Sequence, residues 1–365
     1  MSLFLLDAGR DWRPSQNQIL YVARELRKRN LAAHLVVEPG SELFRRASAE
    51  GLPVLPLRMH GRMAWLVRRS LVREMKDRGC KLIHVHETFG ASLGLAAAAA
   101  AFVPIRILSR TADSSPLEGR LPFASIDGFV AETAGVKSIL VRGGVPDPSV
   151  EVIPLGQDFS AFTSLAPDDL VRRELGLGPE DFLVGAVLPL EDERGQTALL
   201  EASALVGAQT PKVKIVVLGE GTLRLEAGEE GGLPVMDGVR YYLGSGDRTP
   251  RVLASLDMFV VFSHLDGLGV RLIEAMASGL PVAAADVGAA RDLLLHRENG
   301  LLVPPRNAKA LADAILKICF DKTLAARLAA KGREAVLEKY SSEAMARRII
   351  GVYEYRAHRK GLKLA

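Results

Sequence analysis

The sequence has few cysteines, few aromatic residues and no long hydrophobic segment. Its two cysteines, Cys80 and Cys319, are too few for a disulfide framework, so we expect a reducing, cytoplasmic compartment. The most apolar stretch, residues 91–105, is shorter than the roughly 20 apolar residues that a membrane-spanning helix needs. No basic segment precedes the apolar run at residues 3–6, and we expect a buried first strand there in place of a signal peptide.

A strong excess of positive charge is also missing. The formal net charge is +4 over 365 residues, and no zinc-knuckle, RNP or arginine-rich tail pattern accompanies it, so nucleic acid is not an expected partner. With 48% hydrophobic and 25% charged residues the composition is typical of an ordinary soluble protein. The length suits about two domains, each large enough to bury its own core.

Apolar strand patterns alternate with amphipathic helical patterns along the whole chain, which predicts parallel sheets covered by helices on both faces. The hinge between two such domains is expected near residues 155–170. The predicted strands include 3–7, 32–37, 52–57, 81–88, 105–109, 128–131, 182–187 and 259–263, and the predicted helices include 16–29, 134–144, 169–175, 308–319, 323–338 and 342–358.

Residues 259–285 carry the clearest functional pattern. An apolar strand ends at Ser263, a glycine-spaced loop follows, and a helical pattern begins at Val270 and stops at Gly279. The first N–H groups of such a helix, near Gly269 and Val270, lack intrahelical partners and lie at the positive end of the helix dipole. An anion is therefore expected there.

Two acidic residues flank this predicted anion site. Glu274 follows Val270 by four residues, so its carboxylate lies one turn further along the same helix face, where it can accept two hydrogen bonds from a ribose diol. Asp266 precedes the turn and can accept hydroxyls of the group that the phosphate carries. The stretch is thus suited to hold a sugar, a diphosphate and a ribose in line.

Asp266 and Glu274 stand in Ser-His-Leu-Asp-Gly-Leu-Gly and before Ala-Met-Ala-Ser-Gly-Leu-Pro-Val. This arrangement resembles the paired-acid motif of retaining nucleotide-sugar glycosyltransferases of family four, also called glycosyltransferase group 1. The resemblance implies the GT-B fold: two doubly wound, Rossmann-like domains facing across a cleft, with a C-terminal helix that crosses back to the first domain. It implies an acceptor domain, 1–160 with part of 342–365, and a nucleotide-sugar domain, 161–341. The family's first acid is usually Glu, one methylene longer than Asp266.

The same resemblance assigns further donor-binding residues. It places the nucleoside at a turn containing Gly219 and Gly221, and the diphosphate at the loop and helix start formed by Gly267, Leu268, Gly269 and Val270. Of the family's two diphosphate-binding cations, Arg194 stands in the place of the lysine. Pro189 replaces the arginine, and the loss of one charge-assisted hydrogen bond costs about 1.5–3 kcal/mol.

Candidate acceptor residues lie after the first and fourth strands. Where the family usually has a Gly-Gly pair, this chain has Pro14-Ser15, so Ser15 and Gln16 are the acceptor candidates in that loop. His86 and Glu87 end a later strand and open toward the same edge of the sheet. His84 and His86 alternate onto one face, but no third ligand lies nearby in sequence, so no metal is assigned.

Arg110 stands where several family members have a histidine beside the transferred sugar. An arginine stabilises a phosphate or an anionic leaving group but is no base at neutral pH. The catalytic candidates are therefore Asp266, Arg194 and Arg110. No Asp-x-Asp loop is present, so we expect metal-independent transfer without a cofactor, with the nucleotide-diphosphate sugar as a substrate.

Residues 58–81 combine eight basic side chains with interleaved apolar ones. Two interpretations are open: a basic face that contacts anionic lipid headgroups, each cation near the surface contributing about 1 kcal/mol, or a solvated helix whose apolar side belongs to the core. The first would place the protein peripherally on the inner face of the membrane.

The combined interpretation is a cytoplasmic retaining glycosyltransferase that acts on a saccharide or a lipid-linked acceptor of the cell envelope, such as the lipopolysaccharide core. Pro189, Pro14-Ser15 and Asp266 leave a second class open, a weakly active or inactive GT-B scaffold that binds a sugar nucleotide and serves a partner enzyme. A third, a sugar-nucleotide epimerase of the same fold, is disfavoured by the paired acids. The sequence identifies neither the donor nor the acceptor.

Overall fold

The structure, a computed structural model, describes residues 2–60, 64–86, 88–111, 125–164, 166–187, 193–219, 235–236, 239–243, 248–262 and 269–364. The chain divides into two compact units, one of residues 1–157 and 339–365 and the other of residues 158–338. Our sequence-based boundaries, 160/161 and 341/342, stay predictions because a division into compact units does not by itself locate a hinge.

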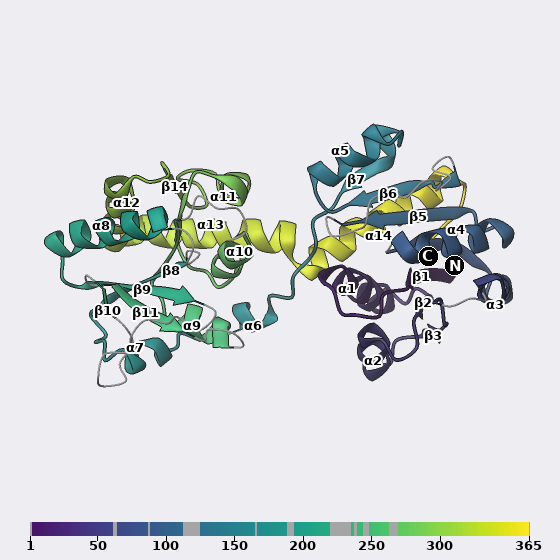
Figure 1. Cartoon of the computed structure of the whole chain (residues 1–365), viewed down its shortest axis with the longest axis horizontal. Helices are drawn as coiled ribbons and strands as arrows, with labels where there is room; N and C mark the ends of the chain where they lie inside the picture. Colours follow the sequence, from purple (N-terminus) through teal and green to yellow (C-terminus); the bar gives the residue numbers. More distant parts are fainter. Residues whose placement is uncertain are drawn as a thin grey trace. The chain divides into compact units, whose positions relative to one another are not determined.

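The first unit is built on a parallel seven-stranded sheet in the order β3-β2-β1-β4-β5-β6-β7 (Figure 1). The strands are β1 (Ser2–Asp7), β2 (Ala33–Val37), β3 (Val54–Pro56), β4 (Cys80–Val85), β5 (Ile105–Arg110), β6 (Gly128–Ala131) and β7 (Val150–Val152). The helices are α1 (Pro14–Lys28), α2 (Glu42–Ala49), α3 (Ala64–Asp77), α4 (Thr88–Ala100), α5 (Ala134–Arg142) and α14 (Ser342–Arg359), and a 3₁₀ turn spans Asp147–Ser149. The expected strand-helix alternation is confirmed here.

The side chains of β1 separate two cores of this unit. Leu3 and Leu5 pack with apolar residues of α1 and α14, whereas Phe4 and Leu6 pack with residues of α3 and α4. Alternate residues of a strand point to opposite faces, so a strand that is apolar throughout must be covered on both. The C-terminal helix α14 thereby belongs to the core of the first unit and lies beside α1 (Figure 1).

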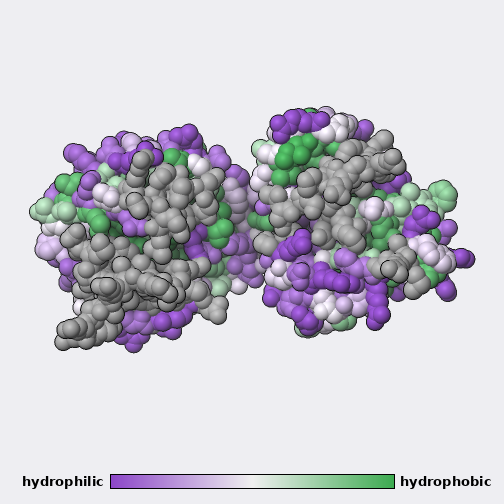
Figure 2. Space-filling view, in the orientation of Figure 1, coloured by the Kyte–Doolittle hydropathy of each residue, from purple (hydrophilic) through white to green (hydrophobic). Residues whose placement is uncertain are grey.

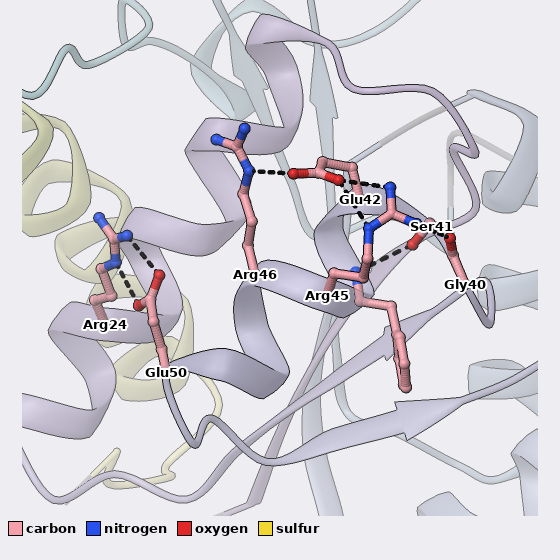
Figure 3. A network of polar contacts seen from close by, with 8 residues as sticks. Arg24, Gly40, Ser41, Glu42, Arg45, Arg46 and Glu50 are labelled. Atoms are coloured by element: carbon pink, nitrogen blue, oxygen red, sulfur yellow. Dashed lines mark hydrogen bonds and ion pairs between the residues drawn. The ribbon is translucent and has the colours of Figure 1, made fainter.

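The helix α2 is held by polar contacts at both of its ends (Figure 3). At its start, the Ser41 hydroxyl accepts a hydrogen bond from the Phe44 N–H over 3.1 Å, a helix cap that contributes about 1 kcal/mol. At its end, Glu50 accepts two hydrogen bonds from the guanidinium of Arg24 on α1, over 2.6 and 2.7 Å. These contacts fix α2 beside α1 and so help to position the N-terminal half of the sheet.

The second unit has a seven-stranded sheet in the order β10-β11-β9-β8-β12-β13-β14, parallel except for the pair β10 and β11. The strands are β8 (Phe182–Val187), β9 (Val213–Gly219), β10 (Val235–Met236), β11 (Val239–Leu243), β12 (Met258–Val261), β13 (Val282–Ala285) and β14 (Leu301–Val303). The helices are α6 (Ser160–Thr163), α7 (Leu170–Glu174), α8 (Glu193–Gln209), α9 (Thr249–Ala254), α10 (Gly269–Ala277), α11 (Gly288–Leu293), α12 (Ala308–Phe320) and α13 (Lys322–Tyr340).

Alternation also organises the core of this unit. Val184 and Ala186 of β8 face α8 and α12, where Ala202 and Ile315 are fully buried against them. Complete burial of an aliphatic side chain such as Ile315 contributes about 1.5–3 kcal/mol. The sheet of the second unit is thus a rigid base for the loops that follow its strands.

The length and hydrophobicity of the helices decide whether any of them could cross a membrane. None of those in the described part of the chain is both long and apolar enough to span one. On the face shown in Figure 2, hydrophobic residues form small patches among hydrophilic ones.

Candidate active site

The helix α10 begins at the place where the order of strands reverses in the second sheet. From β8 the chain moves to β9 and then to β11 on one side, and β12 returns to the other side of β8. Ligands of open α/β sheets bind outside the carboxyl ends of the strands at such a switch point. The loop after β12 leads directly into α10, so the N-terminus of α10 lies at the expected ligand-binding edge.

Gly269 is the first residue of α10, one position before the start that the sequence predicts. A Cβ atom on Gly269 would lie 2.9 Å from the Cβ of Ala289 on α11, closer than two such atoms can approach. A glycine is therefore required here for the close packing of the two helices. Val270 follows with its side chain about half exposed.

Glu274 lies on the buried side of α10, with only 7% of its surface exposed. Its Oε2 accepts a hydrogen bond from Nη1 of Arg271, and the two atoms are 2.8 Å apart. A buried carboxylate is costly unless it is paired, and Arg271 supplies the charge and one hydrogen bond. The arrangement leaves a second carboxylate oxygen, Oε1, for other donors.

The first unit has a switch point of its own. The chain moves from β1 to β2 and β3 on one side, and β4 pairs with the other side of β1. Asp7, the last residue of β1, accepts hydrogen bonds from the Gly9 N–H over 2.8 Å and from Nε2 of Gln16 over 2.9 Å. Burial raises the pKa of the Asp7 carboxyl, and the bonds from Gln16 and Gly9 oppose that rise.

Gln16 and His86 follow the two strands of this switch point, and each is only 2% exposed. Nδ1 of His86 lies 3.1 Å from Oε1 of Gln18, and burial lowers the pKa of His86 to about 3, so the ring is neutral. Among the described residues, Oε1 of Gln16 and Nε2 of His86 have no hydrogen-bond partner. Native proteins rarely leave buried polar atoms unpaired, so these two atoms call for a partner such as a water molecule or a ligand.

His84 has a different role from its neighbour. Its ring centroid lies 3.9 Å from that of His86, with the ring planes tilted by 39°, which confirms that the two lie on one face of β4. Nδ1 of His84 is 2.6 Å from the Tyr353 hydroxyl of α14, and Nε2 is 2.8 Å from the Ser109 hydroxyl of β5. Both ring nitrogens are thus occupied, and His84 ties α14 to the sheet.

Arg110 ends β5, beside β4 in the same sheet. The residue is 6% exposed, and burial lowers the pKa of its guanidinium. A buried cation therefore stands at the carboxyl end of β5, next to β4, the strand that His86 follows.

Several predicted site residues cannot be placed. Asp266, Gly267, Leu268, Gly221 and Glu87 lie outside the described residues, as does Pro189. Ser15 belongs to α1 and Arg194 to α8, but their side chains are also outside the described part. Gly219 is the last residue of β9, where its strand partner is Leu243.

The sequence analysis missed two residues that the structure brings into these sites. Asp7 was read only as the end of a strand, although a carboxylate directly after a buried apolar run is itself a signal for a ligand-binding edge. The ion pair of Arg271 with Glu274 was not predicted either. The spacing of three residues on a helix is the signal that would have found that pair.

A metal site was also sought. In the described part of the chain, no three or more His, Cys, Asp and Glu side chains are grouped closely enough to hold a metal ion. Metal-independent chemistry stays a prediction.

Comparison with known families decides the class of the chain. Residues 168–335 match the family model described as glycosyl transferases group 1, and residues 15–160 match the model described as glycosyltransferase family 4. The chain is a group 1 glycosyltransferase. The two matches together span most of both units, and they confirm the family that the paired acids indicate.

Individual relatives agree with this assignment. The chain is 29% identical to a phosphatidyl-myo-inositol mannosyltransferase of Mycolicibacterium smegmatis, over 93% of this chain and 89% of the relative. It is 27% identical to the lipopolysaccharide core biosynthesis mannosyltransferase LpsB of Rhizobium meliloti, over 56% of this chain and 60% of the relative.

A solved structure shares the fold. The Anabaena protein HepE, in complex with UDP, superposes with a TM-score of 0.67 at 19% identity, over 97% of this chain and all of that one. Together with two α/β units built on parallel sheets, this shows that the group 1 glycosyltransferase described here has the GT-B fold.

Proposed function

We propose that this glycosyltransferase transfers a sugar, with retention of configuration, from a nucleotide-diphosphate sugar to a saccharide or lipid-linked acceptor of the cell envelope. The observation that carries the donor half is the buried, ion-paired Glu274 one turn after the first residue of α10. A helix N-terminus binds phosphate and a carboxylate one turn later binds a diol, so the pair matches a nucleoside diphosphate. Nucleotide binding by the neighbour HepE supports the same donor class.

The acceptor half is proposed for the switch point of the first sheet. Gln16 and His86 each hold a buried polar atom with no partner among the described residues, and a neutral His86 can accept or donate a hydrogen bond to a hydroxyl. Sugar and polyol acceptors present such hydroxyls. Ser15 and Glu87 are proposed to extend this site, and the names of the two mannosyltransferase relatives support a lipid-linked or saccharide acceptor.

Retention fixes what the proposed mechanism needs. The bond between the anomeric carbon and the phosphate oxygen breaks while the acceptor oxygen bonds to the same face of that carbon, and the departing diphosphate takes the acceptor proton. The protein must then stabilise the charge on the leaving group. We assign this to the N–H groups at Gly269 and Val270, to Arg194 and to Arg110, and we assign the donor sugar hydroxyls to Asp266. No metal or cofactor is required in this scheme.

We further propose that α3 contacts an anionic membrane surface. Trp65 and Leu66 of α3 are exposed beside the exposed Arg68 and Arg69. An apolar pair bordered by cations suits the boundary between headgroups and acyl chains. This contact would hold a cytoplasmic enzyme at the inner face of the membrane, where lipid-linked acceptors lie.

Sugar-nucleotide turnover tests this proposal against the scaffold alternative. The purified chain is incubated with GDP-linked and UDP-linked sugars, with and without a lipid extract or a soluble saccharide, and nucleoside diphosphate release is followed. An active transferase releases nucleotide faster when its acceptor is present. Binding of a nucleotide without release under any of these conditions would favour the scaffold.

A further inference from the structure

A pocket of about 230 Å³ lies between α14 and the edge strand β7 of the first unit. Its lining includes Glu151 of β7, Ile153 directly after that strand, and Arg348, Tyr355 and Arg356 from the helix. None of the residues proposed for donor or acceptor binding lines it. With two arginines and one carboxylate, its charged lining is positive.

Arg356 is the unusual member of this lining. Only 9% of the residue is exposed, and its Nε has no hydrogen-bond partner within the described residues. One of its terminal nitrogens donates to the Ser149 carbonyl over a long 3.3 Å. The guanidinium packs against β6, where a Cβ on Gly128 would come within 3.1 Å of Nε. A buried guanidinium without an ion pair is costly, and an anion in the pocket would offset part of that cost.

Arg348 brings a second guanidinium to the pocket. It is exposed, and its Nη2 donates to the Val152 carbonyl of β7 over 2.7 Å, which fixes the side chain along the strand edge. In the described part of the chain, neither Arg348 nor Arg356 forms an ion pair with a carboxylate. Each guanidinium carries five donors, so both keep several for a ligand.

The rest of the lining narrows the class of ligand. Tyr355 is exposed, with the guanidinium carbon of Arg356 5.2 Å from its ring centroid, and Glu151 offers an exposed carboxylate that accepts hydroxyl hydrogen bonds. Gly351 faces open space between the two arginines of the helix. Guanidinium groups recognise phosphate through paired hydrogen bonds, and a carboxylate beside an aromatic ring suits a polyol.

We propose that this pocket binds the phosphate ester of a small polyol. The phosphate is held by Arg356 and Arg348, and the polyol hydroxyls lie toward Glu151 and Tyr355. The same chemistry is presented by a soluble polyol phosphate and by the headgroup of a glycerophospholipid, and the experiment below separates the two sources. The site is independent of the donor and acceptor sites and does not require the proposed transferase activity.

The test uses the full chain labelled with ²H and ¹⁵N and titrated with sn-glycerol 3-phosphate, with the amide signals of Gly351 and Tyr355 as local reporters. Saturable shifts of both are expected, and Arg348→Gln should weaken the apparent affinity at least tenfold. Arg347→Gln is the matched control, because Arg347 is the exposed neighbour on the same helix and does not line the pocket. Local reporters exclude binding at the nucleotide site.

Arg356→Gln and Tyr355→Ala complete the test. Arg356→Gln should abolish the shifts. The circular dichroism spectrum shows whether this variant is folded, and Arg348→Gln tests the pocket independently if it is not. Tyr355→Ala should weaken the binding of glycerol phosphate more than the binding of inorganic phosphate. The proposal would be overturned if the Gly351 signal did not shift during the titration. It would also be overturned if the shifts at Gly351 were equal in Arg348→Gln and Arg347→Gln.

Vesicle co-sedimentation identifies the source of the phosphate. Phosphatidylcholine vesicles with and without phosphatidylglycerol are compared for Arg348→Gln and Arg347→Gln, so that any contribution of α3 is common to both. If Arg348→Gln sediments less with the phosphatidylglycerol vesicles than Arg347→Gln does, the site binds lipid headgroups. Equal sedimentation of the two variants, together with the glycerol phosphate shifts, assigns it to a soluble phosphate.

Discussion

Arg271 and Glu274 form an ion pair on the first turns of α10, with Nη1 of the arginine 2.8 Å from Oε2 of the carboxylate. Glu274 is buried and Arg271 is only partly exposed, so water screens the pair weakly. The pair fixes the orientation of the carboxylate and leaves Oε1 as an acceptor. In the proposed function, this is the group that receives the ribose hydroxyls.

We expect Glu274→Gln to weaken the binding of a nucleoside diphosphate. The amide keeps the size of the side chain but replaces a charged acceptor, and hydrogen bonds to charged groups contribute about 1.5–3 kcal/mol, or roughly ten- to a hundredfold in affinity. Isothermal titration with GDP and UDP measures the change. An affinity equal to that of the wild-type protein would remove Glu274 from the ribose site.

Arg271→Gln should destabilise the second unit, because it leaves the Glu274 carboxylate buried without its cation. A loss of about 1–3 kcal/mol is expected, which for a domain of this size corresponds to about 2–4 °C in Tm for each kcal/mol. The double variant with Glu274→Gln should recover part of the loss, giving a coupling of about 1 kcal/mol in a double-mutant cycle. Strictly additive effects would show that the ion pair contributes nothing.

Gly269→Ala should disturb the N-terminus of α10 because the added methyl group would collide with Ala289 on α11. Overpacking of this kind costs about 1–3 kcal/mol, and the displaced helix start should also weaken nucleotide binding. Gly207→Ala is the matched control, since Gly207 lies in α8 with open space around it and should be neutral or stabilised by about 0.5–1 kcal/mol. Thermal melts and nucleotide titrations of the two variants are compared; similar behaviour would contradict the close contact.

His86 should make the stability of the first unit depend on pH. Burial lowers the pKa of His86 in the folded state to about 3, whereas the pKa of the free side chain is 6.5. Between these two pH values the unfolded state therefore binds the proton more readily than the folded state. The contribution of neutral His86 is complete above pH 6.5 and is lost as the pH falls toward 3, at about 1.4 kcal/mol per pH unit.

Urea denaturation at pH 7.5, 6.5 and 5.5, monitored on the first unit, measures this slope for the wild-type protein and for His86→Gln. In the variant, the free energy of unfolding should change less with pH, because the contribution from the uptake of one proton by His86 is gone. His84, whose pKa burial also lowers, continues to contribute in both proteins. If His86→Gln left the pH dependence of the free energy of unfolding unchanged, the conclusion that His86 is neutral and buried would be contradicted.

The regular part of the fold could be predicted because each element has its own local signal. The strands β6 and β8 have the predicted bounds, since short β-rich runs end at clear turn residues. The helix α10 starts at Gly269, one residue before the predicted start, and the absence of a side chain at Gly269 permits the close contact with Ala289. The helix α2 was not predicted at all, as its signals, Ser41 and an eight-residue amphipathic turn, are short.

The sites were only partly predictable. Glu274 and His86 became candidates because strand ends and helix starts mark the edge of a parallel sheet, and Gln16 through the family resemblance of its loop; the roles of all three stay predictions. The hydrogen bond between His84 and Tyr353 could not be predicted, because the two residues are 269 positions apart in the sequence. Long-range pairs of this kind depend on strand order and helix placement, which local patterns do not contain.

The central claim is sugar transfer that uses the acidic pair, and the most direct measurement compares turnover and nucleotide affinity in Asp266→Ala. Radiolabelled GDP-mannose and UDP-glucose are incubated with the wild-type protein and with the variant in the presence of a membrane lipid extract, and labelled products are separated from donor. The account predicts labelled product with the wild-type protein and none with Asp266→Ala, whose nucleotide affinity stays close to that of the wild type. Equal product formation by both proteins would contradict it.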